Sequence, residues 1–209
     1  MNGKIILVGA FHEMIELAEE NGYEIVGLID NEKIDSYRNY KIVCKDNDAI
    51  NLSPALKLIP LVITPDKPDI RKKLTCFYTK LDFTFSSLLS KECKISKSAT
   101  IGTGSVIQSG VNVSSECKIG MFVKLNNKCN IMHNSTIGDF TTIAPNAVVL
   151  GNVKIGENCY IGANATILPN IKICDDVIVG AGAVVTKDVN SSSILVGNPA
   201  KNIKQIYYS

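Results

Sequence analysis

The sequence predicts an α/β domain over residues 1–84, followed by a parallel β-helix over residues 85–209 that ends in a C-terminal tail. Two observations support this fold class. Apolar strand patterns alternate with helical patterns in the first part, which is typical of a small sheet with crossover connections. From Ile95 onward an aliphatic residue recurs at every sixth position, which is the period of a coil built from short strands.

The six-residue repeat continues without interruption for sixteen anchor positions. A period of six matches neither the 3.6-residue period of a helix nor simple strand alternation, but it suits short flat strands joined by tight corners. Three strands form one triangular turn, so the repeat predicts about five turns. The anchors are Ile95, Ile101, Ile107, Val113, Ile119, Leu125, Ile131, Ile137, Ile143, Val149, Ile155, Ile161, Ile167, Ile173, Val179 and Val185.

A second restricted set stands four residues after each anchor, where every residue is small or β-branched. We expect the anchor to fill the interior of the coil and the smaller residue to turn inward beside a corner. Cys117, Cys129 and Cys159 occupy this smaller position, so we expect them to be buried thiols. Glycine often follows the anchor, as at Gly102 and Gly138, where we expect a backbone conformation that other residues adopt only at a cost.

The composition is that of a globular protein, with 45% hydrophobic residues, 20% charged residues and a net charge of +2. This small charge does not favour a nucleic-acid partner, so we expect a small molecule instead. No apolar run reaches the roughly 18 residues of a membrane span, and the N-terminal stretch lacks the pattern of a signal peptide, so we expect a cytoplasmic protein. The seven cysteines form no CxxC pair, which argues against a disulfide framework and against a metal site, so we expect all seven to be small buried thiols.

The first 84 residues follow the pattern of a Rossmann-like domain. The apolar run KIILVGA is followed by the helical stretch EMIELAEENG, the second apolar run YEIVGLID and, later, the strand pattern LVIT with the helix IRKKLTCFYTK. Ligands on such sheets bind at the carboxyl ends of the strands. The predicted substrate-binding residues are therefore Gly9, Ala10, Phe11, His12, Asp30 and Asn31.

The full GxGxxG fingerprint is absent from this first turn, so a dinucleotide cofactor is not expected, and a nucleotide-sugar pocket is the preferred interpretation. The structural alternative stays open at two positions. His12 can simply begin a helix, and Asp30 can simply cap the end of a strand.

The two-part layout carries the segments NNKCNIMHNSTIGDFTTIAPNAVVLGNVKIG, VGAGAVVTKDV and VGNPAK, and with them it resembles the sialic acid O-acetyltransferase family of hexapeptide transferases. That family includes the bacterial N-acetyltransferases of nucleotide-linked 4-amino sugars, of the bacillosamine, perosamine and viosamine type. The resemblance implies a left-handed β-helix and acetyl-CoA as the acyl donor. It also implies a nucleotide-linked amino sugar as acceptor, a homotrimer and a role in polysaccharide biosynthesis.

The resemblance also assigns roles to residues. His133 matches the catalytic base, Asn126 matches an asparagine close to that base, and Gly151 matches a glycine whose amide faces the thioester carbonyl. Asn134 stands where the family usually has Asp or Glu, and Thr142 stands where it commonly has a second histidine. The residues assigned to binding of coenzyme A are Thr142, Gly151, Ala163, Gly180, Ala181, Lys187, Pro199 and Lys201.

His133 takes the third place of its hexapeptide, an outward-facing corner position where core packing does not explain it. A neutral imidazole can accept the proton that an amine loses as it attacks a thioester. Asn134 can orient the ring but adds no negative charge, so either another acid such as Asp139 assists or the base is weaker. A weaker base suits an amine better than a hydroxyl, which favours N-acetylation of a 4-amino-4,6-dideoxy sugar. The alternatives are O-acetylation of sialic acid or another glycan hydroxyl, and a scaffold without catalysis.

Overall fold

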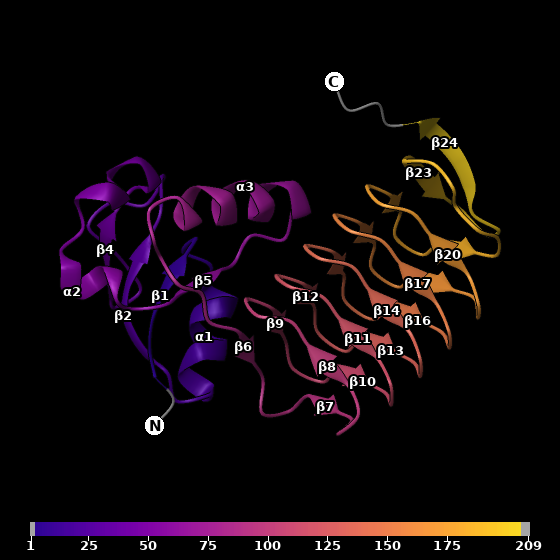
Figure 1. The fold of residues 1–209 in the computed structure, drawn as a ribbon, viewed down its shortest axis with the longest axis horizontal. Helices are drawn as coiled ribbons and strands as arrows, with labels where there is room; N and C mark the ends of the chain where they lie inside the picture. The colour runs from indigo at the N-terminus through magenta and orange to yellow at the C-terminus, as the bar shows by residue number, and fades with distance from the viewer. Residues whose placement is uncertain (1–2, 206–209) are drawn as a thin grey trace.

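The structure is a computed structural model that describes residues 3–205. Its N-terminal part is a five-stranded sheet in the order β3-β4-β2-β1-β5 with helices around it (Figure 1). All neighbouring strands are parallel except β3 and β4. The elements are β1 (Lys4–Val8), α1 (His12–Glu20), β2 (Glu24–Ile29), β3 (Ser36–Tyr37), β4 (Tyr40–Cys44), the 3₁₀ helix η1 (Asp46–Asn51), α2 (Pro54–Lys57), β5 (Leu61–Ile63) and α3 (Pro68–Thr79).

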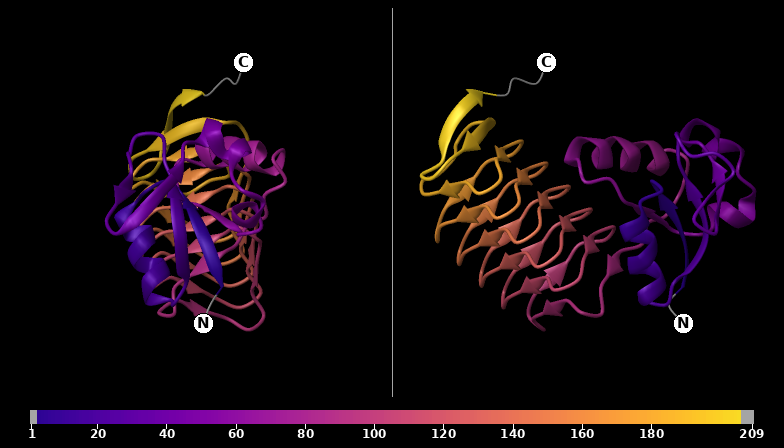
Figure 2. Two further views of the ribbon diagram at one scale, coloured as in Figure 1. Left: turned by 90° about the vertical axis from the view of Figure 1, so that its left-hand side faces the viewer. Right: turned by 180° about the vertical axis from the view of Figure 1, so that it is seen from behind.

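The rest of the chain is a triangular coil of two-residue strands (Figures 1 and 2). These strands are β6 (Leu88–Leu89), β7 (Lys94–Ile95), β8 (Thr100–Ile101), β9 (Val106–Ile107), β10 (Asn112–Val113), β11 (Lys118–Ile119), β12 (Lys124–Leu125), β13 (Asn130–Ile131), β14 (Thr136–Ile137), β15 (Thr142–Ile143), β16 (Val148–Val149), β17 (Lys154–Ile155), β18 (Tyr160–Ile161), β19 (Thr166–Ile167), β20 (Lys172–Ile173), β21 (Ile178–Val179) and β22 (Val184–Val185). The antiparallel pair β23 (Ser193–Val196) and β24 (Lys201–Gln205) closes the far end.

Every third strand belongs to the same parallel sheet, so the coil has three faces. Face 1 contains β6, β9, β12, β15, β18 and β21, face 2 runs from β7 to β22, and face 3 runs from β8 to β20. We name the corners by the faces they join: edge 1–2 includes residues 126–129, edge 2–3 includes residues 132–135, and edge 3–1 includes residues 138–141. Residues 18 apart are stacked neighbours, as Val113 and Ile131 are.

The predicted interior is confirmed. The anchors from Ile107 to Val185 are buried, and the smaller residues four positions later are also buried from Ser105 to Val189. The coil begins one repeat earlier than predicted, because Leu89 in β6 continues the series and packs against the same core. The chain crosses into the coil just before this strand, after Phe85 makes a parallel bridge with Leu61 of the first sheet.

The glycines that follow the anchors have a different cause from the one we expected. Gly102 and Gly138 do not adopt a left-handed conformation; instead, a Cβ added at either would stand 2.4 Å from a backbone carbon of the next turn. Close stacking of successive turns therefore requires them. The left-handed corners fall two residues later, at every sixth position from Glu116 to Asp176, with φ between 54° and 64°. Six of these eleven corner residues are asparagines, which tolerate this conformation better than most residues.

The N-terminal domain is fixed to the coil by a buried arginine. Arg71 of α3 is only 1% exposed, and its guanidinium donates to the carbonyl oxygens of Pro65, Asp66, Phe122 and Phe140. Burial lowers the pKa of Arg71 to about 10. The Phe122 and Phe140 rings stack with their centroids 5.3 Å apart beside it. Face 1 and edge 3–1 of the early turns therefore meet the first domain.

The expectation of buried thiols is confirmed for Cys117, Cys129 and Cys159 and is wrong for the other four. Cys76 is exposed on α3, and the remaining three are half-buried near the surface: Cys44, Cys93 and Cys174. Within residues 3–205, no helix is both long enough and apolar enough to cross a membrane. The same part of the chain contains no cluster of His, Cys, Asp and Glu side chains suited to a metal ion.

Candidate functional site

A cleft of about 730 Å³ lies at the carboxyl edge of the first sheet, and we call it the sheet-edge cleft. All six predicted substrate-binding residues line it. Phe11, which is half exposed, contributes an apolar wall together with Tyr37 and Leu74, while Lys33 and Lys73 bring positive charge. Its size and its mixture of apolar walls with a few polar groups are typical of small-molecule sites.

Asp30 shapes this cleft by binding the backbone around it. Its carboxylate accepts hydrogen bonds from the amides of Ala10 (2.8 Å), Glu32 (2.9 Å) and Lys33 (2.9 Å). Partial burial acts to raise the pKa of Asp30, but these three donors outweigh it and hold the pKa below its ordinary value. Asp30 therefore fixes the turn after β1 against the end of β2. This corresponds to the alternative in which Asp30 caps the end of a strand.

The side chain of Asn31 is also engaged within the protein. Its amide group donates to Asp46 Oδ2 at 2.6 Å and accepts from the Asp46 backbone amide at 3.0 Å. Gly9 is required at its position because φ is +98° and because an added Cβ would lie 2.5 Å from Thr64 Oγ1. Of the six predicted residues, Phe11, His12 and Asn31 are exposed, and among these three Asn31 is the one tied to Asp46.

A second, smaller hollow of about 160 Å³ lies between α1 and face 1 of the coil. Phe11 and His12 line both the hollow and the sheet-edge cleft, so the two spaces share a wall. Lys124 of β12 is 5% exposed; its ammonium lies 2.8 Å from Asp66 Oδ1 and donates to the Thr64 carbonyl at 2.7 Å. Burial lowers the pKa of Lys124, and Asp66 opposes that effect only in part. We call this space the Lys124 hollow.

His133 is exposed on edge 2–3, in the outward position that its hexapeptide predicts. Its Nδ1 lies 3.0 Å from Asn134 Oδ1, and Asn134 holds the left-handed corner with φ of 60°. The other side of the ring faces Gly151 on the next turn, where an added Cβ would stand 2.6 Å from Nε2. Among the described residues no hydrogen bond uses the Gly151 backbone amide. His133, Asn134 and Gly151 therefore form one cluster on one edge.

Asn126 lies on the other corner of the same turn, edge 1–2, so face 2 separates it from His133 within one chain. Its Nδ2 makes a long contact of 3.4 Å with Asp66 Oδ1, and its buried Oδ1 has no hydrogen-bond partner among the described residues. The structure thus places Asn126 with the Lys124 hollow rather than with the histidine of its own chain.

Two further residues lie away from the histidine. Thr142 is fully buried on face 1, and its hydroxyl donates to the Asp66 carbonyl at 2.6 Å, so this side chain offers no exposed surface to a coenzyme. Asp139 lies on edge 3–1 and accepts a hydrogen bond from the Met121 amide at 2.8 Å, so it does not assist His133 of its own chain.

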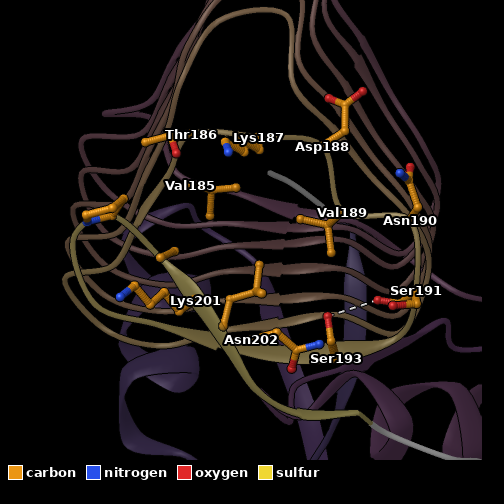
Figure 3. Close-up of a pocket in the computed structure, with 13 residues that line it drawn as sticks. Val185, Thr186, Lys187, Asp188, Val189, Asn190, Ser191, Ser193, Lys201 and Asn202 are labelled. Atoms are coloured by element: carbon orange, nitrogen blue, oxygen red, sulfur yellow. Dashed lines mark hydrogen bonds between the residues drawn. The ribbon is translucent and has the colours of Figure 1, made fainter.

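The remaining residues assigned to coenzyme A fall into two groups. Ala163, Gly180 and Ala181 follow strands of face 1 and lie along edge 1–2, where Ala181 is exposed. Lys187, Pro199 and Lys201 line a pocket of about 360 Å³ at the far end of the coil (Figure 3). Ser191 and Ser193 also line that pocket, and the hydroxyl of the buried Ser193 donates to the Ser191 carbonyl at 2.9 Å.

Sequence reasoning missed Asp66, Arg71 and Lys124, which join the two domains. A signal was present for Asp66, which follows the strand pattern LVIT just as Asp30 follows its own strand. Lys124 precedes an anchor, as the exposed Lys118 and Lys154 also do, so its burial depends on contacts that the sequence does not reveal.

Residues 116–151 and 152–187 match the family model described as bacterial transferase hexapeptide (six repeats). Residues 116–187 are thus similar to hexapeptide transferases. Together with the solved acetyltransferases described next, this similarity identifies the chain as an enzyme that transfers an acyl group, and a scaffold without catalysis is not supported. No curated protein sequence matches the chain with significant similarity.

Solved structures share both parts of the fold. The acetyltransferase domain of PglB from Neisseria gonorrhoeae, determined with acetyl coenzyme A, is 26% identical over 97% of this chain and 100% of that chain, with a TM-score of 0.88. WeeI from Acinetobacter baumannii is 28% identical over 97% and 100%, with a TM-score of 0.86. PerB from Caulobacter crescentus, determined with CoA and GDP-perosamine, is 24% identical over 98% and 99%, with a TM-score of 0.90, a likeness of fold. These relatives confirm an N-terminal α/β domain followed by a left-handed parallel β-helix.

Proposed function

We propose that this enzyme transfers the acetyl group of acetyl-CoA to the amine of a nucleotide-linked 4-amino-4,6-dideoxy sugar. The observation that carries the proposal is the cluster of His133, Asn134 and Gly151, in which an exposed imidazole, a neutral orienting amide and a free backbone N–H share one edge of the coil. The solved relatives supply the substrate classes, because they include complexes with acetyl coenzyme A and with GDP-perosamine.

His133 acts as the general base. With the proton on Nδ1, the ring donates to Asn134 Oδ1, and Nε2, which lies on the Gly151 side of the ring, carries the free lone pair. As the sugar amine attacks the thioester carbon, Nε2 takes the amine proton; the C–N bond forms, the C–S bond breaks, and the departing CoA sulfur receives a proton. Asn134 fixes the tautomer without adding charge, which is sufficient for an amine because a neutral amine is already a good nucleophile.

The Gly151 amide stabilises the negative charge that develops on the thioester oxygen. Its N–H has no partner among the described residues and lies directly beside the imidazole. Loss of one such donor typically raises the activation free energy by about 3 kcal/mol. Lys187 and Lys201, in the pocket at the end of the coil, provide cations for the phosphates of the coenzyme.

The acceptor binds with its nucleotide in the sheet-edge cleft. Phe11 and Tyr37 offer faces on which a base can stack, and Lys33 and Lys73 offer charge for a diphosphate. Gly9 and Ala10 contribute backbone close to the ligand, Asp30 holds that backbone through the Ala10 amide, and Asn31 is fixed by Asp46.

The active enzyme is a homotrimer in which each site uses two chains. Asn126 and His133 both match residues of the family's active site, yet they lie on different edges of one coil. Packing edge 2–3 of one chain beside edge 1–2 of a neighbour brings the two types of residue together and creates a groove that a single convex coil lacks.

The test is release of free thiol from acetyl-CoA, measured with a panel of UDP-, dTDP- and GDP-linked 4-amino sugars and with sialic acid and other hydroxyl acceptors. We expect transfer to one or more of the amino sugars and none to the hydroxyl acceptors. Transfer to a hydroxyl alone would show that the enzyme is an O-acetyltransferase, and absence of transfer to every acceptor would contradict the proposal.

A further inference from the structure

Lys124 occupies an unusual place for a lysine. It lies on the outward side of face 1, in a column that also contains Val106 and Thr142, and the first domain covers all three. Lysine is almost never this deeply buried unless its charge is paired. Burying an apolar side chain at this position, as at Val106, would cost less free energy than burying a charge. The buried ammonium therefore requires an explanation.

The ammonium of Lys124 has one donor left over. Its contacts are Asp66 Oδ1 at 2.8 Å and the Thr64 carbonyl at 2.7 Å. An ammonium group carries three N–H donors, and partners within the described residues account for two of them. Asp66 holds the ammonium in place through this ion pair. The carboxylate of Asp66 is itself 56% exposed at the hollow. The third donor is therefore held in a fixed position beside the Lys124 hollow.

The other groups around the hollow indicate what it can accept. Glu13 and Asp66 bring carboxylates, His12 an imidazole and Lys124 an ammonium. Two carboxylates beside one ammonium would disfavour a phosphate, since like charges brought together are repelled. Alternating donors and acceptors around a small space suit a sugar ring that carries an amine and one or two hydroxyl groups.

The position of the hollow relates it to the acceptor. Its volume of about 160 Å³ is well below the 300–1,000 Å³ of whole-ligand pockets, whereas the adjoining sheet-edge cleft lies within that range. Phe11 and His12 line both, so one ligand can place a large part in the cleft and a small part in the hollow. Asp66 also contacts Asn126 on edge 1–2, which places the hollow beside the edge that we assign to acetyl transfer.

We infer that the Lys124 hollow holds the sugar ring of the nucleotide-linked acceptor, and that Lys124 determines specificity by donating its remaining N–H to one ring hydroxyl. The inference rests on the proposed function and extends it to the sugar. A site built to bind a hydroxyl discriminates strongly against an analogue without it, because the buried donor is then left unpaired.

The experiment compares the full-length enzyme, Lys124→Met and the control Lys154→Met, which removes an exposed lysine from face 3. Each is assayed with the best nucleotide-linked amino sugar and with its monodeoxy analogues, and binding of the matching nucleoside diphosphate is measured by calorimetry. For the unaltered enzyme and the control, we expect kcat/KM to fall about 10- to 100-fold with one analogue. We expect Lys124→Met to use that analogue and the parent sugar equally well, while its affinity for the nucleoside diphosphate changes less than about twofold.

Two results would overturn the inference. One is that Lys124→Met retains the full discrimination among the analogues; the other is that it weakens nucleoside diphosphate binding as much as it weakens use of the acceptor. If Lys124→Met does not fold, Lys124→Arg is used instead, because it keeps the charge beside Asp66 but moves the N–H donors. Unchanged discrimination among the analogues by Lys124→Arg would also overturn the inference. Failure of the unaltered enzyme to acetylate any amino sugar is a separate result, since it contradicts the proposed function before any variant is compared.

Discussion

The imidazole ring of His133 packs directly on the backbone of Gly151, one turn further along the coil. A Cβ added at residue 151 would stand 2.6 Å from Nε2 and 2.7 Å from Cε1. The glycine therefore provides the space in which the ring lies, and at the same time it brings a free backbone N–H to the ring. One residue thus supports both parts of the proposed chemistry.

Gly151→Ala is expected to inactivate the enzyme without unfolding it. The new methyl group displaces an exposed side chain, which can rotate away, so the melting temperature should change little while kcat falls about 100-fold. Gly138→Ala is the matched comparison, because there the methyl group meets the backbone of the next turn at 2.4 Å, and we expect loss of the folded coil. Circular dichroism and the thiol assay measure both effects. Full activity of Gly151→Ala would mean that the ring does not work in the position seen here.

His133→Ala should lower kcat by about 100-fold or more, because a positioned base typically contributes 10²- to 10⁴-fold. Binding of coenzyme A, measured by calorimetry, should stay nearly unchanged, since the imidazole contacts the reacting amine rather than the nucleotide of the donor. Met121→Ala is the control, because Met121 has the equivalent place in its hexapeptide and is 47% exposed. A fall of less than about fivefold for His133→Ala would remove the residue from the mechanism.

Asn134→Asp tests the orienting group. A carboxylate in place of Oδ1, 3.0 Å from Nδ1, favours the protonated imidazole. The acid limb of the variant's kcat/KM profile should therefore move to higher pH, because the carboxylate stabilises the imidazolium form. An identical pH profile and rate in the two enzymes would show that residue 134 does not face the ring during catalysis.

The coil was predictable because its determinants are local. Each turn repeats the same six positions, so burial of the anchors and exposure of His133 follow from the place of each residue in its repeat. The same counting separates His133 from Asn126, since seven residues carry the chain from one edge to the next. Leu89 also follows this rule, because it stands six positions before Ile95, and its pairing with Ile107 shows that the coil begins there.

The contacts between the domains were not predictable in this way. Lys124 and Asp66 are 58 positions apart in the sequence, and nothing in either repeat or strand pattern specifies that they meet. Asp30 shows a different limit. Its place at a strand end was visible, but a carboxylate there can bind either a ligand or the backbone, and only the three amide donors decide between them.

Asp30→Asn is expected to make stability depend less on pH. The pKa of Asp30 lies below its ordinary value of 3.8 in the folded protein, so the carboxylate contributes stability above pH 3.8 that is lost as the pH falls through the folded-state pKa. At pH 7 the variant should be less stable by about 1–2 kcal/mol, measured by urea unfolding, because the amide is a weaker acceptor for three backbone donors. The difference should close toward pH 2, and a difference that is equal at pH 7 and pH 2 would contradict this role.

Complementation tests whether two chains share each site. His133→Ala alters edge 2–3, and Ala181→Trp places a bulky ring on edge 1–2 where Ala181 is exposed, so each variant should be inactive alone. The two variants are then co-refolded in equal amounts. A groove is intact when its edge 2–3 comes from a chain with Ala181→Trp, which keeps His133, and its edge 1–2 comes from a chain with His133→Ala, which keeps Ala181. Random assembly gives that arrangement in about a quarter of grooves, so about a quarter of the original activity should return.

Refolding each variant with the unaltered chain is the control, because one wall is then always intact and about half of the grooves should work. Subunit exchange is verified separately, by recovering one variant through an affinity tag that only the other variant carries. If both walls came from the same chain, no mixture of the two variants could contain an intact site. A mixture that stays inactive while the controls regain activity would therefore place the whole site within one chain, and Asn126 could not act beside His133.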